Sequence, residues 1–519
     1  MKWLYNIKAG IVCLAAGSLL LVGGCDEFLD KAPSKNTNVE ISTLEHLNGL
    51  LAPYNTFCME RSATLIFSTD DCEIPMSLYK RDASQFSLSE IQYYLWDQEY
   101  VSDDVRAYYW MDEYKKIYYA NLVLENLGKV EGNAEDKERL RCEAYFVRAY
   151  SYFNLVENYC LPYSEANKKE PGLPIKKTVS FEESVKRATL QATYEFIESD
   201  LAEALKTKEH FIDEGTRNRV WRINIAAVNG LAARFYLCKN DYANAFKYAE
   251  AALAERNTMV DYNTEMYYGD DEIVTIDYGT PQQQDIVIKT PCTYKKHLAV
   301  DPSDPFNWNE LYYYRYLSCD GFWYIPSQNL LSLYDKEYDL RYKYHIIEQY
   351  SYIHWMNEAP SYLYPGYVFF NQFGAISGPT AAEMLLIKAE CLARRGEVGN
   401  AMKEVNILRA NRISNAAPQE KINLTATTKE QAVKLILEER RREMPFVRRW
   451  SDLRRLNNNE DPNDDVVLER EFFPYSSSAI AVNSEPIKYR LDKNSRRYAA
   501  PIPRTEIVAS DGMIEQNKY

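Results

Sequence analysis

The stretches ARFYLCKNDYANA (residues 233–245) and AECLARRGEVGNA (residues 389–401) form an internal repeat that indicates the fold class of this chain. Each has the pattern of a helix end, a tight turn at Asn240 or Gly396, and a second helix that opens with Asn-Ala. Alanines where two helices would cross, large apolar residues between them and a short turn are typical of a tetratricopeptide-like hairpin. The repeat predicts such helix pairs, although the copies are too few and too widely spaced for a regular solenoid.

Helical periodicity extends outward from these two copies. Apolar residues recur every three or four positions in residues 140–159 and again in residues 104–128. Residues 142–159 and 190–205 are predicted to form another pair, separated by a Pro-rich insertion at 161–175. The fold class is therefore mainly α, with a helical scaffold over about 104–256 and 378–455.

Two long segments lack this period. Residues 257–377 are rich in Tyr, Trp, Pro and Gly, and a second irregular segment runs over 456–519. Such segments predict loops and short strands carried by the scaffold, where binding residues tend to lie. We expect residues 41–519 to form one domain, with the ligand side in the 257–377 insertion.

The N-terminus has the pattern of an export signal. Lys2 and Lys8 precede an apolar run, Ile11–Val22, that is short for a membrane span, and Gly23-Gly24 stands directly before Cys25. This pattern predicts a lipoprotein signal peptide over residues 1–24, diacylglycerol on the Cys25 thiol, and a lipidated tether over 25–40. The alternatives are an uncleaved anchor or an ordinary signal peptide with a chance cysteine.

The composition of the chain limits the classes of ligand that it is expected to bind. The 519 residues carry a formal charge of −14, which argues against nucleic acid and other polyanions as ligands. The chain has 43 tyrosines, whose flat rings suit helix packing and, in a minority, interfaces or sugar-binding surfaces. The cysteines form no CxxC pair, and Cys58 with Cys72 is one candidate disulfide.

No catalytic motif is present in the sequence. We find no G-x-S-x-G elbow, P-loop or H-E-x-x-H, and the five histidines are scattered. His345, Glu348 and His354 make only a weak candidate metal set, and with 75 acidic residues paired carboxylates arise by chance. We therefore expect no metal, no cofactor and no enzyme activity. In residues 438–455 the glutamates between the arginines predict internal ion pairs rather than a nucleic-acid patch.

Several motifs along the chain resemble those of the SusD/RagB nutrient-uptake lipoproteins of the Bacteroidota outer membrane. The motifs are Cys25-Asp26-Glu27-Phe28-Leu29-Asp30, the W-x3-Y-x2-I-x2-A-N helix from Trp110 to Asn121, the block ERRREMPFVRRWSDLRR at 439–455, and Ile502-Pro503 with the ending Gln516-Asn517-Lys518-Tyr519. Two departures occur, a shortened step before Arg449-Trp450 and the trimmed ending, and they affect local geometry more than membership.

The resemblance implies a function as well as a mainly helical, SusD-like fold. It implies a surface lipoprotein of the cell outer membrane that captures a nutrient, expected to be an oligosaccharide, for a SusC-like TonB-dependent transporter. Asp26-Glu27 after the lipidated cysteine fits display on the cell exterior. The same architecture binding peptides, as in the RagB branch, is the alternative; a surface glycan hydrolase and a scaffold for other envelope proteins are weaker ones.

Aromatic residues outside the scaffold are the candidate ligand contacts. An indole or phenol ring stacks on the apolar face of a pyranose while polar neighbours bond its hydroxyls. By loose analogy with glycan-binding relatives, the candidates are Arg81 and Trp96, then Trp323 and Tyr324, with Trp308 and Trp355. The competing interpretation, equally supported, is that these aromatic rings pack the insertion onto the scaffold.

Overall fold

The computed structural model describes residues 41–97, 108–180, 182–213, 218–268, 271–277, 283–289, 292–294, 304–318, 324–351, 363–369, 374–476 and 479–519. Cys25, the predicted tether, Trp323 and Trp355 lie outside these residues. The described chain starts with short elements: α3 (Leu44–Leu51), α4 (Tyr54–Phe57), β1 (Met59–Glu60), α5 (Ala63–Phe67), α6 (Met76–Arg81), the 3₁₀ turn η1 (Ala83–Gln85) and α7 (Leu88–Tyr94).

Helices, most of them three turns or longer, make up the scaffold in two blocks separated by the insertion. They are α8 (Tyr108–Asn126), α9 (Ala134–Tyr159), α10 (Leu190–Ala204), α11 (Ile225–Cys238) and α12 (Tyr242–Glu255), then α17 (Ala381–Arg394), α18 (Val398–Ala410), α19 (Gln419–Ile422), α20 (Lys429–Glu443) and α21 (Arg449–Leu456). Polar side chains begin most of them; Asn224, for example, accepts a bond from the Ala227 amide, 2.9 Å away, and so satisfies a free N–H at the start of α11.

The repeated stretches form the predicted hairpins. Asn240 (φ 59°) joins α11 to α12, and Gly396 (φ 85°) joins α17 to α18. In both turns the left-handed residue bonds back to the helix end, and the next amide reaches the carbonyl five residues earlier: Asp241 to Tyr236, and Glu397 to Leu392. This is the Schellman ending, which gives the chain the tight reversal that a helix pair needs.

The hairpins stack because small residues lie at their crossings. The four matched alanines Ala233, Ala245, Ala389 and Ala401 are all fully buried. Without larger side chains between them the helices approach closely, and α12 packs on α17 as well as on α11. The predicted pairing of α9 with α10 is also present, so the mainly helical fold is confirmed.

The remaining strands lie mainly in the insertion and the C-terminal segment, with β2 (Pro171–Pro174) and β3 (Arg187–Thr189) in the connection between α9 and α10. The others are β4 (Met266–Tyr268), β5 (Asp271–Asp277), β6 (Gln283–Lys289), β7 (Cys292–Tyr294), β8 (Tyr316–Leu317), β9 (Ile346–Ile347), β10 (Gly366–Tyr367), β11 (Ala375–Ile376), β12 (Leu468–Phe472), β13 (Tyr475–Ser476), β14 (Ala479–Ile480) and β15 (Ile487–Leu491). The short helices of the insertion and the C-terminal segment are α13 (Tyr262–Glu265), η3 (Asp304–Asn307), α14 (Gln328–Leu331), α15 (Leu340–His345), η5 (Arg496–Tyr498) and α22 (Arg504–Ala509).

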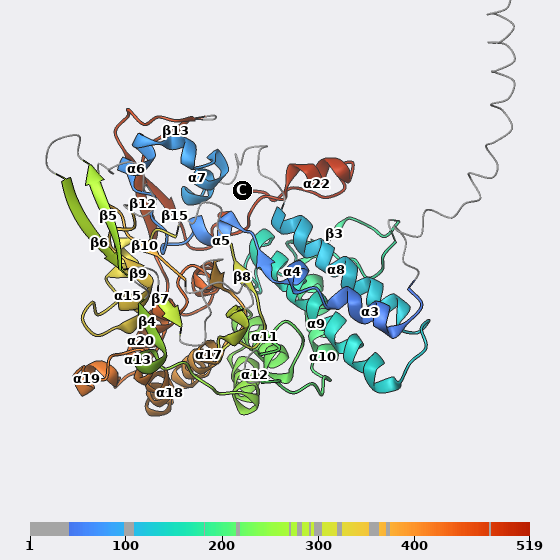
Figure 1. Ribbon diagram of the computed structural model, residues 1–519. Helices are drawn as coiled ribbons and strands as arrows, with labels where there is room; N and C mark the ends of the chain where they lie inside the picture. The colour runs from blue at the N-terminus through green and yellow to red at the C-terminus, as the bar shows by residue number, and fades with distance from the viewer. Residues whose placement is uncertain are drawn as a thin grey trace, which may run out of the picture.

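These strands make small sheets rather than one layer. Within the described residues β8 pairs in parallel with β1 and antiparallel with β11, and the other strands form two-stranded ribbons. In Figure 1 most ribbons lie on the left, whereas α3 and α8–α10 lie on the right. The loops and short strands expected in the insertion are confirmed, together with short helices that its irregular pattern did not predict.

The arginine-rich block is buried, and most of its guanidinium groups form ion pairs or bond to backbone carbonyls. Arg440 binds Asp452 in α21 (2.8 Å), and Arg455 binds Glu390 in α17 (2.7 Å). Arg449 reaches Asp70, 2.6 Å away, and so ties the C-terminal block to the N-terminal segment. The ion pairs predicted for residues 438–455 are therefore confirmed, and the arginines of this block are buried rather than exposed to a polyanion.

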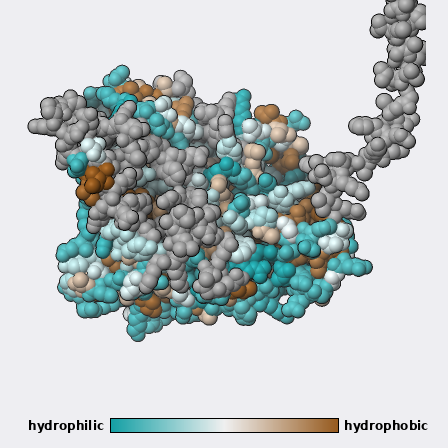
Figure 2. Space-filling model, viewed as in Figure 1, coloured by the Kyte–Doolittle hydropathy of each residue, from teal (hydrophilic) through white to brown (hydrophobic). Residues whose placement is uncertain are grey.

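The remaining features of the fold are its free cysteines and the character of its surface. Cys58 and Cys72 are buried free thiols, so the candidate disulfide is not formed. Among the described residues no helix has the length and apolar character to cross a membrane. Figure 2 shows mostly hydrophilic colours on its lower half and a brown patch over β5 and β6, where Ile273 and Val287 are exposed.

Candidate functional site

A hollow lined by aromatic rings lies where the insertion meets the end of α20. Its volume is about 80 Å³. The lining residues are Tyr262, Trp308, Glu310, His345, Tyr367, Phe369, Ala375, Ile376, Thr380, Glu443, Met444, Pro445 and Val447. Four of its five ring-bearing residues were not among the predicted contacts, and all five come from the insertion.

Trp308 is the predicted contact that the structure places at this hollow. It follows η3, and its ring meets Tyr294 edge-on with centroids 4.9 Å apart and Tyr262 at 6.1 Å. Only 5 % of its surface is exposed. Trp308 therefore forms a wall of the hollow and gives a ligand its edge more than its open face.

His345 fixes the opposite wall. Its ring lies parallel to Tyr367 with centroids 5.3 Å apart, and burial lowers the pKa of His345 to about 4, so the imidazole is neutral at neutral pH. A carbonyl only accepts, so Nδ1–H donates to the Val368 oxygen (2.9 Å) and Nε2 accepts from the Tyr262 hydroxyl (3.2 Å). Both ring nitrogens are thereby used in holding the hollow together.

Two carboxylates, Glu310 and Glu443, form the polar side of the hollow. Arg412 lies between them and donates to Glu310 at 2.7 and 2.9 Å and to Glu443 at 2.8 Å. Arg341 donates to the other Glu443 oxygen at 2.9 Å, and the Val260 amide to Glu310 at 2.7 Å. All four oxygens accept bonds, so this pair is held as a structural ion-pair cluster.

Burial alone would raise the pKa of Glu443, but Arg412 and Arg341 outweigh it and lower that pKa. Glu443 therefore remains a carboxylate. A general acid or base needs a proton or a lone pair aimed at the substrate, which a carboxylate occupied in this way does not offer.

Trp96 does not form a stacking platform, contrary to the sequence prediction. It ends α7 in the left-handed conformation (φ 55°), with the Asp97 amide reaching Gln92, and only 1 % of it is exposed. Its indole N–H donates to the Ser68 carbonyl (2.9 Å), and the Arg470 guanidinium covers its ring at 4.2 Å. A helix-ending role in the core explains this ring, and it has no face free for a sugar.

Tyr324 is likewise structural. It is 2 % exposed and donates to the Leu317 carbonyl at 2.6 Å. Its ring packs edge-on against Phe369 and Phe446, so it supports the wall of the hollow from behind. Arg81 ends α6 and is partly exposed, away from the lining of this hollow.

Sequence reasoning missed Tyr262, His345, Tyr367 and Phe369. The first three are buried, and their periodicity is that of loop residues, so nothing in the pattern separated them from packing aromatics. In the sequence, His345 is singled out only as a member of a weak candidate metal set. In the part of the chain that the structure describes, no group of three His, Cys, Asp or Glu is placed to hold a metal ion.

Comparisons with known proteins agree with this architecture. A family model described as starch-binding and associating with the outer membrane matches residues 27–237, and the SusD family model matches residues 381–519. No curated protein matches the chain.

Solved structures share the fold. A SusD-like protein from Bacteroides fragilis has a TM-score of 0.61 at 18 % identity, covering 94 % of this chain and 99 % of its own. A SusD-like carbohydrate-binding protein from Bacteroides vulgatus has a TM-score of 0.55 at 15 % identity, covering 91 % and 97 %.

A laminarin-binding SusD-like protein also has a TM-score of 0.55, at 16 % identity, covering 92 % of this chain and 99 % of its own. Identities this low show the fold alone. Taken with the two family models, which match both ends of the chain, they lead to one conclusion: the chain belongs to the SusD/RagB family.

Proposed function

We propose that this protein is a surface-exposed lipoprotein that captures an oligosaccharide and delivers it to a SusC-like TonB-dependent transporter. The observation that carries the proposal is the aromatic hollow, because its aromatic side chains, Trp308, Tyr367 and Phe369 among them, all come from the insertion rather than the scaffold. Family membership supports it, since the matched family model is described as starch-binding.

The hollow is suited to binding a sugar without catalysing a reaction on it. Aromatic rings bury the apolar C–H groups of a sugar, and its volume of about 80 Å³ accepts part of one ring rather than a whole chain. The remaining contacts would come from neighbouring insertion residues. Trp323 and Trp355 are proposed among them, and Arg81 is kept as a separate candidate.

The lipid anchor at Cys25 is part of this proposal. Its support is the apolar run followed by Gly23-Gly24 before the cysteine, and the acidic pair Asp26-Glu27 that fits exterior display. The described fold begins at residue 41, so a tether of this length would leave the domain free to sit over a partner barrel.

A glycan panel tests the cargo. Because one solved relative is described as laminarin-binding, laminarin is the first probe, followed by starch and other neutral glycans, in calorimetry and affinity electrophoresis. Saturable binding of one glycan is expected. Failure of every glycan together with peptide recovered from the purified protein would favour the peptide alternative, and turnover of a bound glycan would favour a hydrolase.

Phe369→Ala should weaken glycan binding by about tenfold while leaving the protein folded. Phe369 lines the hollow and is partly exposed, so its removal takes away a contact surface without emptying the core. Calorimetry against the glycan selected by the panel measures the change. Tyr118→Ala, which removes an exposed ring from α8, is the control and should bind like the unmodified chain. Equal loss in both variants would contradict the assignment of the site.

A further inference from the structure

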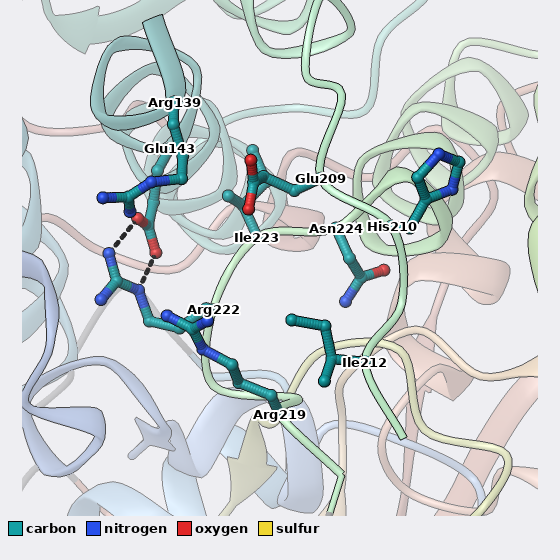
Figure 3. Close-up of a pocket in the computed structure, with 9 residues that line it drawn as sticks. All are labelled: Arg139, Glu143, Glu209, His210, Ile212, Arg219, Arg222, Ile223 and Asn224. Carbon is teal, nitrogen blue, oxygen red and sulfur yellow. Dashed lines mark hydrogen bonds and ion pairs between the residues drawn. The ribbon is translucent and has the colours of Figure 1, made fainter. Parts of the chain in front are cut away.

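A second hollow, lined by charged residues, lies on the α3 side of the molecule. Its volume is about 10 Å³, room for about one oxygen-sized atom, and it opens to solvent. Three arginines line it, Arg139, Arg219 and Arg222, with Glu143 and Glu209. Figure 3 shows Arg219 beside Arg222 at one side of the hollow and Glu209 across from them.

The helices fix two of these arginines. Arg222, just before α11, grips Glu143 of α9, with its Nε 2.6 Å from Oε1, and its Nη2 donates to Asn48 of α3 at 3.0 Å. Arg139, one turn before Glu143, is held loosely, 3.5 Å from Asn48 and 3.4 Å from Asp136. The hollow is therefore built on α3, α9 and the segment that leads into α11.

Arg219 is different. Its backbone amide bonds to the Ile212 carbonyl at 3.2 Å, but its guanidinium makes no hydrogen bond or ion pair with the residues that the structure describes. It is partly buried and lines the same small hollow as Arg222. Like charges that line one small hollow repel unless an anion lies between them.

The two carboxylates at the hollow do not balance the positive charge of its three arginines. Glu143 is used by Arg222 at both oxygens, which leaves Glu209 opposite Arg139 and Arg219. Guanidinium groups bind oxyanions through paired N–H donors, and a carboxylate opposite accepts from a protonated oxygen of the same ligand. Inorganic phosphate and a phosphate monoester offer both kinds of oxygen, and one such oxygen fits a space of this volume.

We propose that this hollow is an oxyanion site that takes a phosphate group, from a lipid headgroup at the membrane surface or free in solution. Its place favours the lipid: Asn48, which touches both Arg139 and Arg222, belongs to α3, the first described helix after the tether. Residues 26–40 span at most about 50 Å when extended. In Figure 1 this side lies opposite α13, α15 and α20, which carry the aromatic hollow.

The proposal that the phosphate group comes from a lipid rests on the proposed anchor at Cys25, whereas the binding of free phosphate does not. The test uses the chain from Asp26 onward, without lipid, and two probes: inorganic phosphate by calorimetry, and vesicles of phosphatidylcholine with or without phosphatidic acid by co-sedimentation. Arg219→Ala should weaken phosphate binding by about tenfold or more, because charge-assisted bonds are lost. Its melting temperature should not change, since the Arg219 side chain bonds to none of the described residues.

Lys115→Ala is the matched control, because it removes one exposed positive charge from α8. The proposal is supported when Arg219→Ala alone loses both phosphate and acidic-vesicle binding. Loss of phosphate binding with no vesicle binding in any chain assigns the site to free phosphate and overturns the lipid source. Unchanged binding in Arg219→Ala, or tighter binding of an acidic polysaccharide than of either probe, overturns the proposal while leaving neutral-glycan capture intact.

Discussion

Glu439→Ala is expected to lower the free energy of unfolding by about 3–5 kcal/mol. Glu439 is fully buried in α20 and accepts from Arg341 (2.7 Å), Arg409 (2.6 Å) and Arg442 (2.7 Å). Arg341 keeps Asp339 and Glu443, but Arg409 and Arg442 lose their carboxylate and keep only backbone carbonyls. Two buried guanidinium charges then lack a carboxylate partner. Leaving a buried charge unpaired destabilises the fold by more than the net stabilisation that the ion pair contributed.

Urea unfolding at neutral pH measures this effect. Glu438→Ala is the matched control: it removes a neighbouring, partly exposed glutamate of the same helix that makes no ion pair with the described residues, and should cost less than about 1 kcal/mol. Similar losses in both variants would show that the network contributes little.

At acid pH the unmodified chain and Glu439→Ala should have nearly the same free energy of unfolding. Burial alone would raise the pKa of Glu439, but Arg341, Arg442 and Arg409 hold it well below its ordinary value. A depressed folded pKa gives stability that is complete above the unfolded pKa, about 4.3, and is lost as pH falls toward the folded pKa. The gap in unfolding free energy should therefore be constant from pH 6 to 8 and shrink below about pH 4. A gap that narrows toward alkaline pH instead would contradict this origin.

Cys25→Ala should remove the protein almost completely from the outer-membrane fraction. Under the proposed function the acyl chains on Cys25 supply the membrane affinity, at about 0.8 kcal/mol per buried CH₂ group. No helix of the described residues could replace them by crossing the bilayer. Because the described fold starts at residue 41, the domain itself should remain folded.

Cell fractionation with immunoblotting measures the loss, and circular dichroism checks the fold. Cys13→Ala is the control, because Cys13 lies inside the predicted signal peptide and should leave with it. Retention of Cys25→Ala in the outer membrane of a strain that lacks the proposed transporter would show that lipid on Cys25 is not the anchor.

Part of the arginine network could be predicted from sequence and part could not. Glutamates interleaved with arginines in residues 438–455 indicate internal ion pairs, since opposite charges three or four residues apart on a helix are neighbours. The partners of Arg449 and Arg455 could not be found in this way, because Asp70 and Glu390 lie far away in the sequence. Spacing along one helix reports only neighbours three or four residues away.

The candidate site was less predictable. Trp96 and Tyr324 were expected to meet ligand, yet one ends a helix under Arg470 and the other supports the wall behind Phe369. An exposed aromatic platform and a buried aromatic brace have the same residue types, and only burial distinguishes them.

The helix pairs follow from local sequence, because alanine placement, helical period and the Asn240 and Gly396 turns are properties that each hairpin carries in its own residues. The candidate site depends instead on how distant segments pack. Tyr262, His345 and Glu443 come from three distant segments, and they meet only because α13, α15 and the end of α20 pack together. A hollow is a property of that packing, and no single stretch of the chain encodes it.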